Sequence, residues 1–366
     1  MTRILFLPLL QIPSGHHHVA DTIQFLLKEK GVAARCDKVD LLSYSYGKAE
    51  AMVSSCYLQW IHYMPGLYGK IYRYSAYRKA SSKSRYLLYE KLFLTGMKRL
   101  LEEYKPDLAV CTHALPSYLL SHLQAKKEWK GTVINAYTDF FINDIWGVPG
   151  KGYHLVPNSE SKDLLVSRGV DEEAIFVTGI PVHPLFQKEN AVESSKKTVL
   201  ISGGNMGAGA ILNLLKSLAP NGDADYTVLC GKNRKLFEYI KQLSRPSIKP
   251  IGFIESKEEM NRLYDEAHAI ITKPGGVTVS ECLLKRLPIF VYDALPGQEE
   301  MNLDYLYRKG LVRQLNNWRT SNWEAQLLGS LNCSKTAGRY KEKVQDYVSQ
   351  LDKRPVAEIL GAILNI

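Results

Sequence analysis

The chain has 366 residues, of which 45% are hydrophobic and 23% charged, and its formal net charge at pH 7 is +10. This length exceeds what one ordinary compact core fills, so we expect two globular domains of moderate size. The sequence holds no run of about 18 uninterrupted apolar residues, so no segment is expected to cross a bilayer as a helix.

The first apolar stretch, MTRILFLPLLQIPSG, is short, carries a single Arg and leads into a polar Gly-His turn rather than a small-residue cleavage site. We therefore interpret it as a buried strand and not as a signal peptide. The six cysteines are scattered, without a CxxC pair or a ligand-like spacing to the histidines. This pattern predicts a reduced, cytoplasmic protein without a metal site.

Apolar runs rich in β-branched residues alternate with amphipathic stretches of helical period, which is typical of parallel α/β layers. The alternation stops at a polar segment, QKENAVESSKK, and then restarts. We therefore predict an α/β fold with two doubly wound domains and a cleft between them. Strands are predicted at residues 4–10, 33–39, 108–112, 132–136, 152–156 and 175–178, and again at 198–202, 226–230, 249–252, 269–272 and 289–291. Residues 338–364 have a helical pattern that periodicity alone assigns to neither sheet.

A histidine-rich loop follows the first strand and reads PSGHHHVA, with an amphipathic helix predicted over residues 19–30. Ligands of doubly wound sheets bind beyond the carboxyl ends of the strands, so a histidine in this loop faces the cleft. An imidazole with a pKa near 6.5 can take a proton from an alcohol at neutral pH. His16 is therefore our candidate general base. The alternative is a set of surface or helix-capping histidines, and adjacent side chains in a turn diverge too much to form a metal site.

The second predicted domain opens with a glycine-rich loop, residues 203–209, between a strand and a helix predicted over residues 210–218. Gly204 and Asn205 lie where backbone N–H groups and a helix N-terminus can hold a phosphate. Such a loop is also found in dinucleotide-binding proteins and in plain turns. The P-loop Lys is missing, which argues against a nucleoside triphosphatase. The next strand ends in Cys-Gly-Lys-Asn (residues 230–233), where a dinucleotide-binding fold has a ribose-binding carboxylate.

The most informative segment, TKPGGVTVSE (residues 272–281), combines a strand end, a Pro-Gly-Gly turn and a helix start. We expect the N–H groups of residues 275–278 to face a second phosphate. Glu281 would then accept hydrogen bonds from both ribose hydroxyls, because a carboxylate offers two acceptor oxygens. The alternative is a capping arrangement with a solvated Glu281. After the following strand, Gln298 and Glu299 in the segment LPGQEEMN are suited to bind sugar hydroxyls.

These segments together resemble one family of enzymes. TKPGGVTVSE, CGKN, the Gly-Phe pair at 252–253 and PGQEEMN resemble the glycosyltransferases that include the bacterial diacylglycerol glucosyltransferases and plant monogalactosyldiacylglycerol synthases, and more distantly the undecaprenyl-muramylpeptide GlcNAc transferase. In the first predicted domain, SGHHHVA, YTDFFINDIW and VTGIPVHPLF are similar to further segments of the same family. The resemblance runs in the family's order from residue 6 to about residue 310.

The resemblance implies a GT-B fold and an inverting, metal-independent transfer from a UDP-sugar, with no cofactor. It also implies an acceptor-binding domain over residues 1–185, a UDP-sugar-binding domain over residues 190–345 and a C-terminal helix, residues 346–366, that returns to the first domain. His16 would be the base and Asp139 its acidic partner, with Phe253 beside the uracil. The implied substrate-binding residues are Gly15, Gly204, Asn205, Gly231, Lys232, Asn233, Phe253, Lys273, Gly275, Gly276, Val277, Thr278, Glu281, Gln298 and Glu299.

Two positions depart from the family pattern. Asn143 stands where lipid glycosyltransferases of this type usually carry His, which bears on the acceptor more than on the sugar transfer. The first glycine loop reads Ser-Gly-Gly-Asn (residues 202–205) in place of three consecutive glycines.

The acceptor is predicted from a basic and aromatic segment. Residues 70–105 hold ten Lys or Arg against three Glu, and residues 44–104 hold eleven of the 22 tyrosines. Aromatic rings with polar tips and basic side chains suit the surface of an anionic membrane, so we expect residues 57–104 to contact lipid. The alternatives are nucleic-acid binding and a solvated basic face.

The leading hypothesis is a hexosyltransferase that acts on a lipid hydroxyl such as that of diacylglycerol, on the cytoplasmic face of the membrane. Its partners would be a UDP-sugar, the acceptor lipid and anionic lipids, without nucleic acid. A transferase with a soluble acceptor and a nucleotide-binding protein without transfer activity are the alternatives. The sequence leaves open which hexose is transferred and how many are added.

Overall fold

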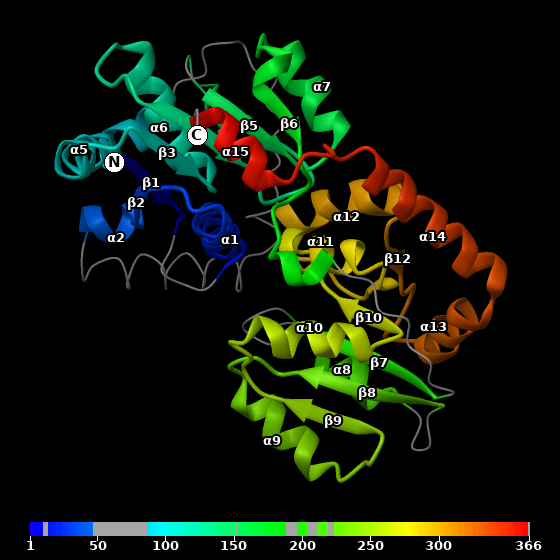
Figure 1. Cartoon of the computed structure of the whole chain (residues 1–366). Coiled ribbons are helices and arrows are strands. Elements are labelled where there is room, and N and C mark those ends of the chain that lie inside the picture. The colour runs from blue at the N-terminus through cyan, green and yellow to red at the C-terminus, as the bar shows by residue number, and fades with distance from the viewer. Residues whose placement is uncertain are drawn as a thin grey trace. The chain divides into compact units, whose positions relative to one another are not determined.

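The computed structural model describes residues 1–9, 14–46, 86–148, 150, 152–187, 196–203, 211–218 and 223–364 (Figure 1). The chain divides into two compact units. The first comprises Met1–Pro181, Pro296–Gln298 and Gln350–Ile366, and the second comprises Val182–Leu295 and Glu299–Ser349.

The first unit is built on a six-stranded sheet with the order β2-β1-β3-β4-β5-β6, in which every neighbouring pair is parallel. All four residues of β3 are buried, as expected where helices cover both faces of a parallel sheet. The strands are β1 (Thr2–Leu7), β2 (Ala34–Lys38), β3 (Leu108–Cys111), β4 (Thr132–Ala136), β5 (Gly152–Val156) and β6 (Ile175–Val177).

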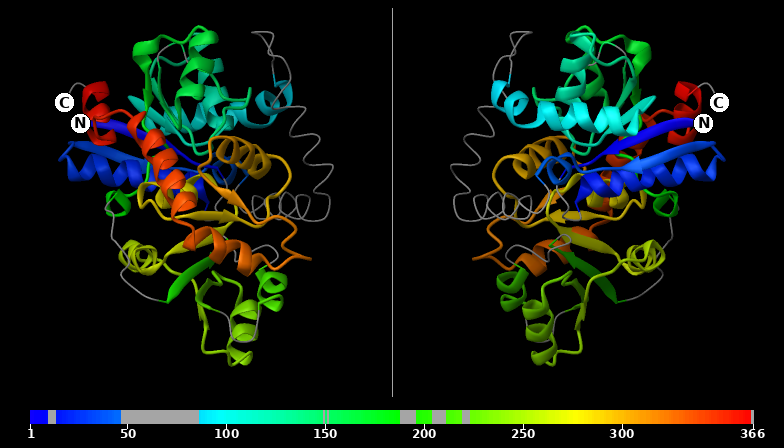
Figure 2. Two further views of the ribbon diagram at one scale, coloured as in Figure 1. Left: turned by 90° about the vertical axis from the view of Figure 1, so that its right-hand side faces the viewer. Right: turned by 90° about the vertical axis from the view of Figure 1, so that its left-hand side faces the viewer.

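Six α-helices of the described part of this unit cover the sheet. They are α1 (Gly15–Glu29), α2 (Leu41–Tyr46), α5 (Leu87–Tyr104), α6 (Ala114–Ala125), α7 (Ser159–Ser167) and α15 (Val356–Leu364), with a short 3₁₀ turn η2 (Glu172–Ala174). His113 and Asn158 cap the N-termini of α6 and α7 with their side chains. The last helix, α15, lies beside α1, and its residue Glu358 forms an ion pair of 3.6 Å with Lys30, the residue that follows α1. Figure 2 shows α15, in red, beside the blue N-terminal part of the same unit, to which α1 belongs.

The second unit repeats this architecture with the strand order β12-β11-β10-β7-β8-β9, again with parallel neighbours. Its strands are β7 (Lys197–Ser202), β8 (Ala224–Leu229), β9 (Ile248–Ile251), β10 (Ala269–Thr272), β11 (Ile289–Val291) and β12 (Arg313–Gln314). Its helices are η3 (Pro184–Gln187), α8 (Ile211–Lys216), α9 (Arg234–Gln242), α10 (Lys257–Glu266), α11 (Gly276–Leu284), α12 (Gln298–Arg308), α13 (Trp323–Asn332) and α14 (Ser334–Ser349). The buried tyrosine Tyr226 and the buried indole of Trp323 anchor its core.

Two parallel six-stranded sheets confirm the predicted α/β fold class, and each of the eleven predicted strands is present. Two expectations about helices were wrong. The first helix begins at Gly15 rather than at residue 19, and the predicted helix over residues 338–364 is two helices, α14 and α15. Pro355 lies just before α15 and cannot continue a preceding helix. Among the residues that the structure describes, no helix has the length and apolar character that a bilayer span requires.

Candidate functional site

His16 lies in the first turn of α1 and not in a loop. Ser14 occupies the N-cap position in an extended conformation, and the N–H group of His18 donates to the Ser14 carbonyl at 3.2 Å. The buried residues Val19 and Ile23 on the same helix fix this turn beyond the end of β1. The helix itself therefore positions the imidazole, which leaves His16 less freedom than a loop residue has.

The ring of His16 is held by the ends of two neighbouring strands. Its Nδ1 lies 2.7 Å from the backbone oxygen of Thr112, just after β3, and 3.0 Å from Oγ1 of Thr138, just after β4. A carbonyl oxygen only accepts hydrogen bonds, so Nδ1 carries the proton of the neutral ring. Nε2 consequently carries the lone pair, which is the form a general base requires.

A second histidine, His113, lies against this ring. The two ring centroids are 4.9 Å apart in an edge-on arrangement with an interplanar angle of 79°. Nδ1 of His113 accepts from the N–H group of Leu115 at 3.1 Å, so its lone pair is engaged in capping α6. Burial and the proximity of His16 hold the pKa of His113 well below its usual value. His113 is therefore a neutral neighbour of His16.

Burial also lowers the pKa of His16, while the charge of Asp139 and the hydrogen bond to Thr112 oppose this shift. Asp139 thus acts on His16 through its charge, and the hydrogen bonds that hold Nδ1 come from Thr112 and Thr138. Gln298, in the short piece assigned to the first unit, donates its amide to Oδ2 of Asp139. At neutral pH the imidazole of His16 is in its proton-accepting form.

Asn143, which replaces the expected His, organises its own turn. Its Oδ1 accepts from the N–H group of Ile145 at 3.1 Å, and its side chain is buried. A buried hydrogen bond supports the same segment, because the side chain of Asn135 donates to the carbonyl of Gly147 at 3.1 Å. The segment between β4 and β5 is therefore built from its own polar contacts.

The N-terminus of α11 follows β10 in the second unit. Gly275 is the N-cap residue in an extended conformation, and a Cβ added there would meet no atom within 4 Å. The first helical residues are Gly276, Val277 and Thr278, whose N–H groups belong to the unsatisfied first turn. The open space in front of a helix N-terminus suits an anion such as a phosphate.

Glu281 is buried in the second turn of α11, with 8% of its surface exposed. The hydroxyl of Tyr264 on α10 donates to its Oε2 at 2.9 Å. Burial raises the pKa of this carboxyl to about 7, although the hydrogen bond from Tyr264 and the charge of Lys257 oppose the shift. This burial excludes the alternative in which Glu281 is a solvated capping residue.

The polar residues after β10 and at the start of α12 lie close together. Nζ of Lys273, which is buried, is 3.9 Å from Oε2 of Glu299, and the same oxygen accepts from the N–H group of Leu295 at 2.6 Å. Gln298 and Glu299 both belong to the first turn of α12. The structure thus brings Lys273 and Glu299, two of the predicted residues, into contact.

Two further predicted residues meet beyond β8 and β9. Nζ of Lys232 lies 5.0 Å from the centroid of the Phe253 ring, which is 38% exposed. Asn233 caps α9 by accepting from the N–H group of Leu236 at 3.0 Å, and Gly231 has a positive φ of 55°. The exposed ring is available for stacking, whereas the Asn233 side chain oxygen is engaged in the helix cap.

Gly204 and Asn205 lie outside the described residues, as does most of the segment 57–104. Within the ranges that the structure describes, no group of three His, Cys, Asp or Glu side chains is arranged to hold a metal ion. Sequence reasoning missed His113, Thr138 and Tyr264. The position of His113 directly after a predicted strand was the one signal that could have identified it.

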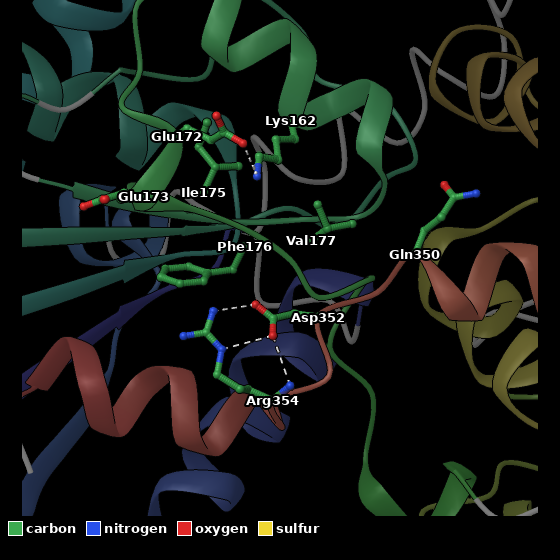
Figure 3. Close-up of a pocket in the computed structure, with 9 residues that line it drawn as sticks. All are labelled: Lys162, Glu172, Glu173, Ile175, Phe176, Val177, Gln350, Asp352 and Arg354. Atoms are coloured by element: carbon green, nitrogen blue, oxygen red, sulfur yellow. Dashed lines mark hydrogen bonds and ion pairs between the residues drawn. The ribbon is translucent and has the colours of Figure 1, made fainter.

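A cavity of about 550 Å³ in the first unit lies apart from these residues (Figure 3). It is bordered by β6, α7 and the C-terminal segment, and both of its basic residues form ion pairs with acidic ones. Lys162 pairs with Glu172 at 2.9 Å, and Arg354 pairs with Asp352 at 2.7 Å. The N–H group of Asp352 also donates to the carbonyl of Val177. This hydrogen bond connects the C-terminal segment to β6.

Comparison with known proteins identifies relatives. Residues 16–182 match the family described as Monogalactosyldiacylglycerol (MGDG) synthase. The chain is 45% identical over 368 residues to the uncharacterized glycosyltransferase YkoN of Bacillus subtilis (strain 168), covering 100% of this chain and 98% of that protein. It is 27% identical over 314 residues to a processive diacylglycerol beta-glucosyltransferase of Bacillus thuringiensis (strain Al Hakam), covering 81% of this chain and 78% of the relative.

Among solved structures, MurG from Acinetobacter baumannii resembles this chain with a TM-score of 0.60 at 13% identity, over 100% of both chains. At this identity the likeness shows the fold alone, and it confirms the GT-B architecture. The relatives confirm the resemblance that the sequence motifs indicated.

Proposed function

This chain belongs to the family of GT-B glycosyltransferases that includes the monogalactosyldiacylglycerol synthases and the processive diacylglycerol glucosyltransferases, and we propose that it transfers a hexose from a UDP-sugar to a lipid hydroxyl. The transfer inverts the anomeric carbon and requires no metal ion. The observation that carries the proposal is the geometry of His16, whose Nδ1 is held by Thr112 so that Nε2 is left as the base.

In the proposed reaction the acceptor oxygen attacks the anomeric carbon as its proton moves to Nε2 of His16. The bond between the anomeric carbon and the UDP oxygen breaks, and UDP leaves with the bonding electrons. An alcohol has a pKa far above neutrality, so removal of its proton during attack lowers the barrier, typically by a factor of 10²–10⁴. Direct displacement from the opposite face inverts the configuration.

The donor side of the proposal rests on α11 and its surroundings. The open N-terminus at Gly275 would hold the pyrophosphate, and the buried Glu281 would bind the ribose hydroxyls. Phe253, with its exposed ring beside Lys232, would stack on the uracil. Lys273 and Glu299 would bind the hexose, and N–H groups in place of a metal would stabilise the departing phosphate.

Two observations support a lipid acceptor. One relative is a processive diacylglycerol beta-glucosyltransferase, and helix α5 has a surface suited to a membrane. Leu87 and Leu92 on this helix are 62% and 46% exposed. Lys91, Lys98 and Arg99 lie on the same helix with exposed side chains, although Lys98 pairs with Glu128 and the helix ends with the exposed Glu102 and Glu103. Exposed apolar residues next to basic ones suit the surface of an anionic membrane, so we place the enzyme on the cytoplasmic face.

The test is incubation of the purified protein with several UDP-hexoses and vesicles that contain diacylglycerol, followed by mass analysis and determination of the anomeric configuration. We expect a hexosyl lipid of inverted configuration, formed equally well in EDTA. Activity that EDTA abolishes and Mn²⁺ restores would contradict the metal-independent mechanism. Transfer to soluble alcohols but not to lipid in vesicles would favour a soluble acceptor. If no donor supports transfer, the alternative of a nucleotide-binding protein without transfer activity would be favoured.

A further inference from the structure

Two neighbouring residues of α10 contact Glu281 of α11 and Lys285, the residue that follows this helix. Tyr264 donates its hydroxyl to Oε2 of Glu281 at 2.9 Å, and Asp265 forms an ion pair with Lys285. The side chain of Lys285 is 2% exposed, and Asn261 donates to the other oxygen of Asp265 at 2.9 Å. These two polar contacts fix the register of α10 against α11.

The carboxyl of Glu281 lies in a largely apolar environment. Its charged or titratable neighbours are Tyr264 and Lys257 on α10 and Cys282 on its own helix. The turn η3, which packs against both helices, has the sequence PLFQ and carries no charge. The ring of Phe186 from η3 lies edge-on to Tyr264 with centroids 5.6 Å apart, which restricts the phenol. The Tyr264 hydroxyl is thus a fixed donor to a carboxylate that water barely reaches.

We propose that Tyr264 is a positioning residue for the nucleotide, whose hydroxyl holds Oε2 of Glu281 so that the remaining acceptor sites of the carboxylate face the ribose hydroxyls. This role rests on the proposed function, in which Glu281 binds the ribose. A carboxylate has about four lone-pair directions, so one bond to Tyr264 leaves enough of them for two hydroxyls. Without that bond the carboxylate can rotate and binds the ribose less well.

The same hydrogen bond tunes the ionisation of Glu281. Burial favours the neutral acid, whereas a donor to the carboxylate favours the charged form, and the balance puts the pKa at about 7. Below that pH the carboxyl is protonated and loses acceptor capacity, so affinity for UDP falls as pH drops through about 7. Removal of the Tyr264 hydroxyl raises the pKa further, so the loss of affinity begins at a higher pH.

The chain provides a matched control. Tyr226 is also buried and donates its hydroxyl to Oε1 of a buried glutamate, Glu324, at 2.7 Å. Tyr226 belongs to the core that includes Trp323. Neither Tyr226 nor Glu324 is among the proposed donor-binding residues. Tyr226→Phe therefore removes an equivalent buried hydrogen bond without touching Glu281.

The experiment measures the dissociation constant of UDP by calorimetry from about pH 6 to about pH 9 for the wild type, Tyr264→Phe and Tyr226→Phe, together with thermal unfolding. We expect Tyr264→Phe to weaken UDP binding about 10- to 150-fold at pH 7, the scale of one hydrogen bond to a charged group. The ratio to wild type should shrink at high pH, where Glu281 ionises in both proteins, and the phosphate titration of UDP cancels in this ratio. Tyr226→Phe should lower thermal stability to a similar degree and leave UDP affinity unchanged.

A double-mutant cycle with Glu281→Gln separates positioning from a general structural effect. If Tyr264 acts through Glu281, Tyr264→Phe adds little to the loss of affinity that Glu281→Gln causes alone. Additive losses, or a pH profile of Tyr264→Phe that matches the wild type, would overturn the positioning role. Failure of the wild type to bind UDP at any pH would overturn the proposed function and this role with it, whereas normal UDP binding by Tyr264→Phe would overturn the role alone.

Discussion

Nδ1 of His16 lies 2.7 Å from the backbone oxygen of Thr112. Because this partner is a main-chain carbonyl, its contribution to the tautomer of His16 does not depend on the side chain at position 112. A carboxylate partner would hold the same nitrogen but would also charge the site. The backbone contact fixes the tautomer without adding a charge, and the pKa of His16 is lowered by burial, which outweighs the opposing effects of Asp139 and of this hydrogen bond.

His16→Ala should lower kcat by a factor of about 10²–10⁴, because it removes the proposed base. UDP affinity and thermal stability should change little, since the proposed donor contacts belong to the second unit and a half-buried first-turn side chain contributes little to the core. His17→Ala and His18→Ala serve as controls from the same turn and should stay within a few-fold of wild type. Initial rates and UDP calorimetry check this, and near-normal kcat in His16→Ala would show that another group is the base.

Asp139→Asn should shift the pH dependence of transfer. The charge of Asp139 raises the pKa of His16, so its removal lowers that pKa further and moves the acidic limb of kcat to lower pH. A less basic imidazole also accepts the proton less readily, so the plateau rate should fall by a modest factor, less than in His16→Ala. Rate profiles of both variants decide between the candidates. Inactive Asp139→Asn beside active His16→Ala would make Asp139 the base.

Burial and periodicity made the sheets predictable. Most of the eleven predicted strands are buried apolar runs, which are typical of parallel strands, whereas β2 (ARCDK) contains no buried residue. The missed strand, β12, is two residues long, Arg313 and Gln314, and has no apolar run to reveal it. The start of α1 was missed because His16 and its neighbours are polar, and their helical conformation follows from burial of Val19 and Ile23 further along.

The site was less predictable because its contacts join distant segments. His113 meets His16 because β1 and β3 are paired, with Leu7 opposite Cys111, and the sequence does not state which strands are neighbours. Tyr264 reaches Glu281 only through the packing of α10 on α11. Motifs identify residues near a strand end, whereas the partners that orient them come from strand order and helix packing.

Replacement of Leu87 and Leu92 by Ser should weaken binding to vesicles of anionic lipid. Both side chains are largely exposed, so the fold should be retained while the apolar area available for insertion falls. Val166→Ser on α7 of the same unit is a matched control, because Val166 is 42% exposed and lies outside the proposed membrane segment. Cosedimentation in low and high salt measures the effect. Equal binding to neutral and anionic vesicles would contradict the contribution of the basic residues.

Glu281→Gln should weaken UDP binding and abolish its pH dependence near neutrality. Gln keeps the shape and one acceptor oxygen but loses the charge, and hydrogen bonds to charged groups contribute roughly 1.5–3 kcal/mol each. Affinity for UDP should fall about tenfold or more at pH 8, and the change of affinity around pH 7 should vanish because position 281 no longer titrates. Calorimetry across this range measures both effects, and a pH dependence that persists in Glu281→Gln would assign the titration to another group.

The same substitution should stabilise the protein without nucleotide at alkaline pH. The folded pKa of Glu281, about 7, lies above the usual 4.5, so the folded state favours the protonated form. Its contribution to the free energy of unfolding is therefore greatest below about pH 4.5 and is lost as pH rises through about 7. Above that pH the wild type bears the full cost of a buried charge, up to about 3 kcal/mol, and Gln bears none. Denaturant unfolding at about pH 8 should show Glu281→Gln as the more stable protein, with the difference disappearing on acidification, and a less stable variant at both pH values would mean that the carboxylate is needed for folding itself.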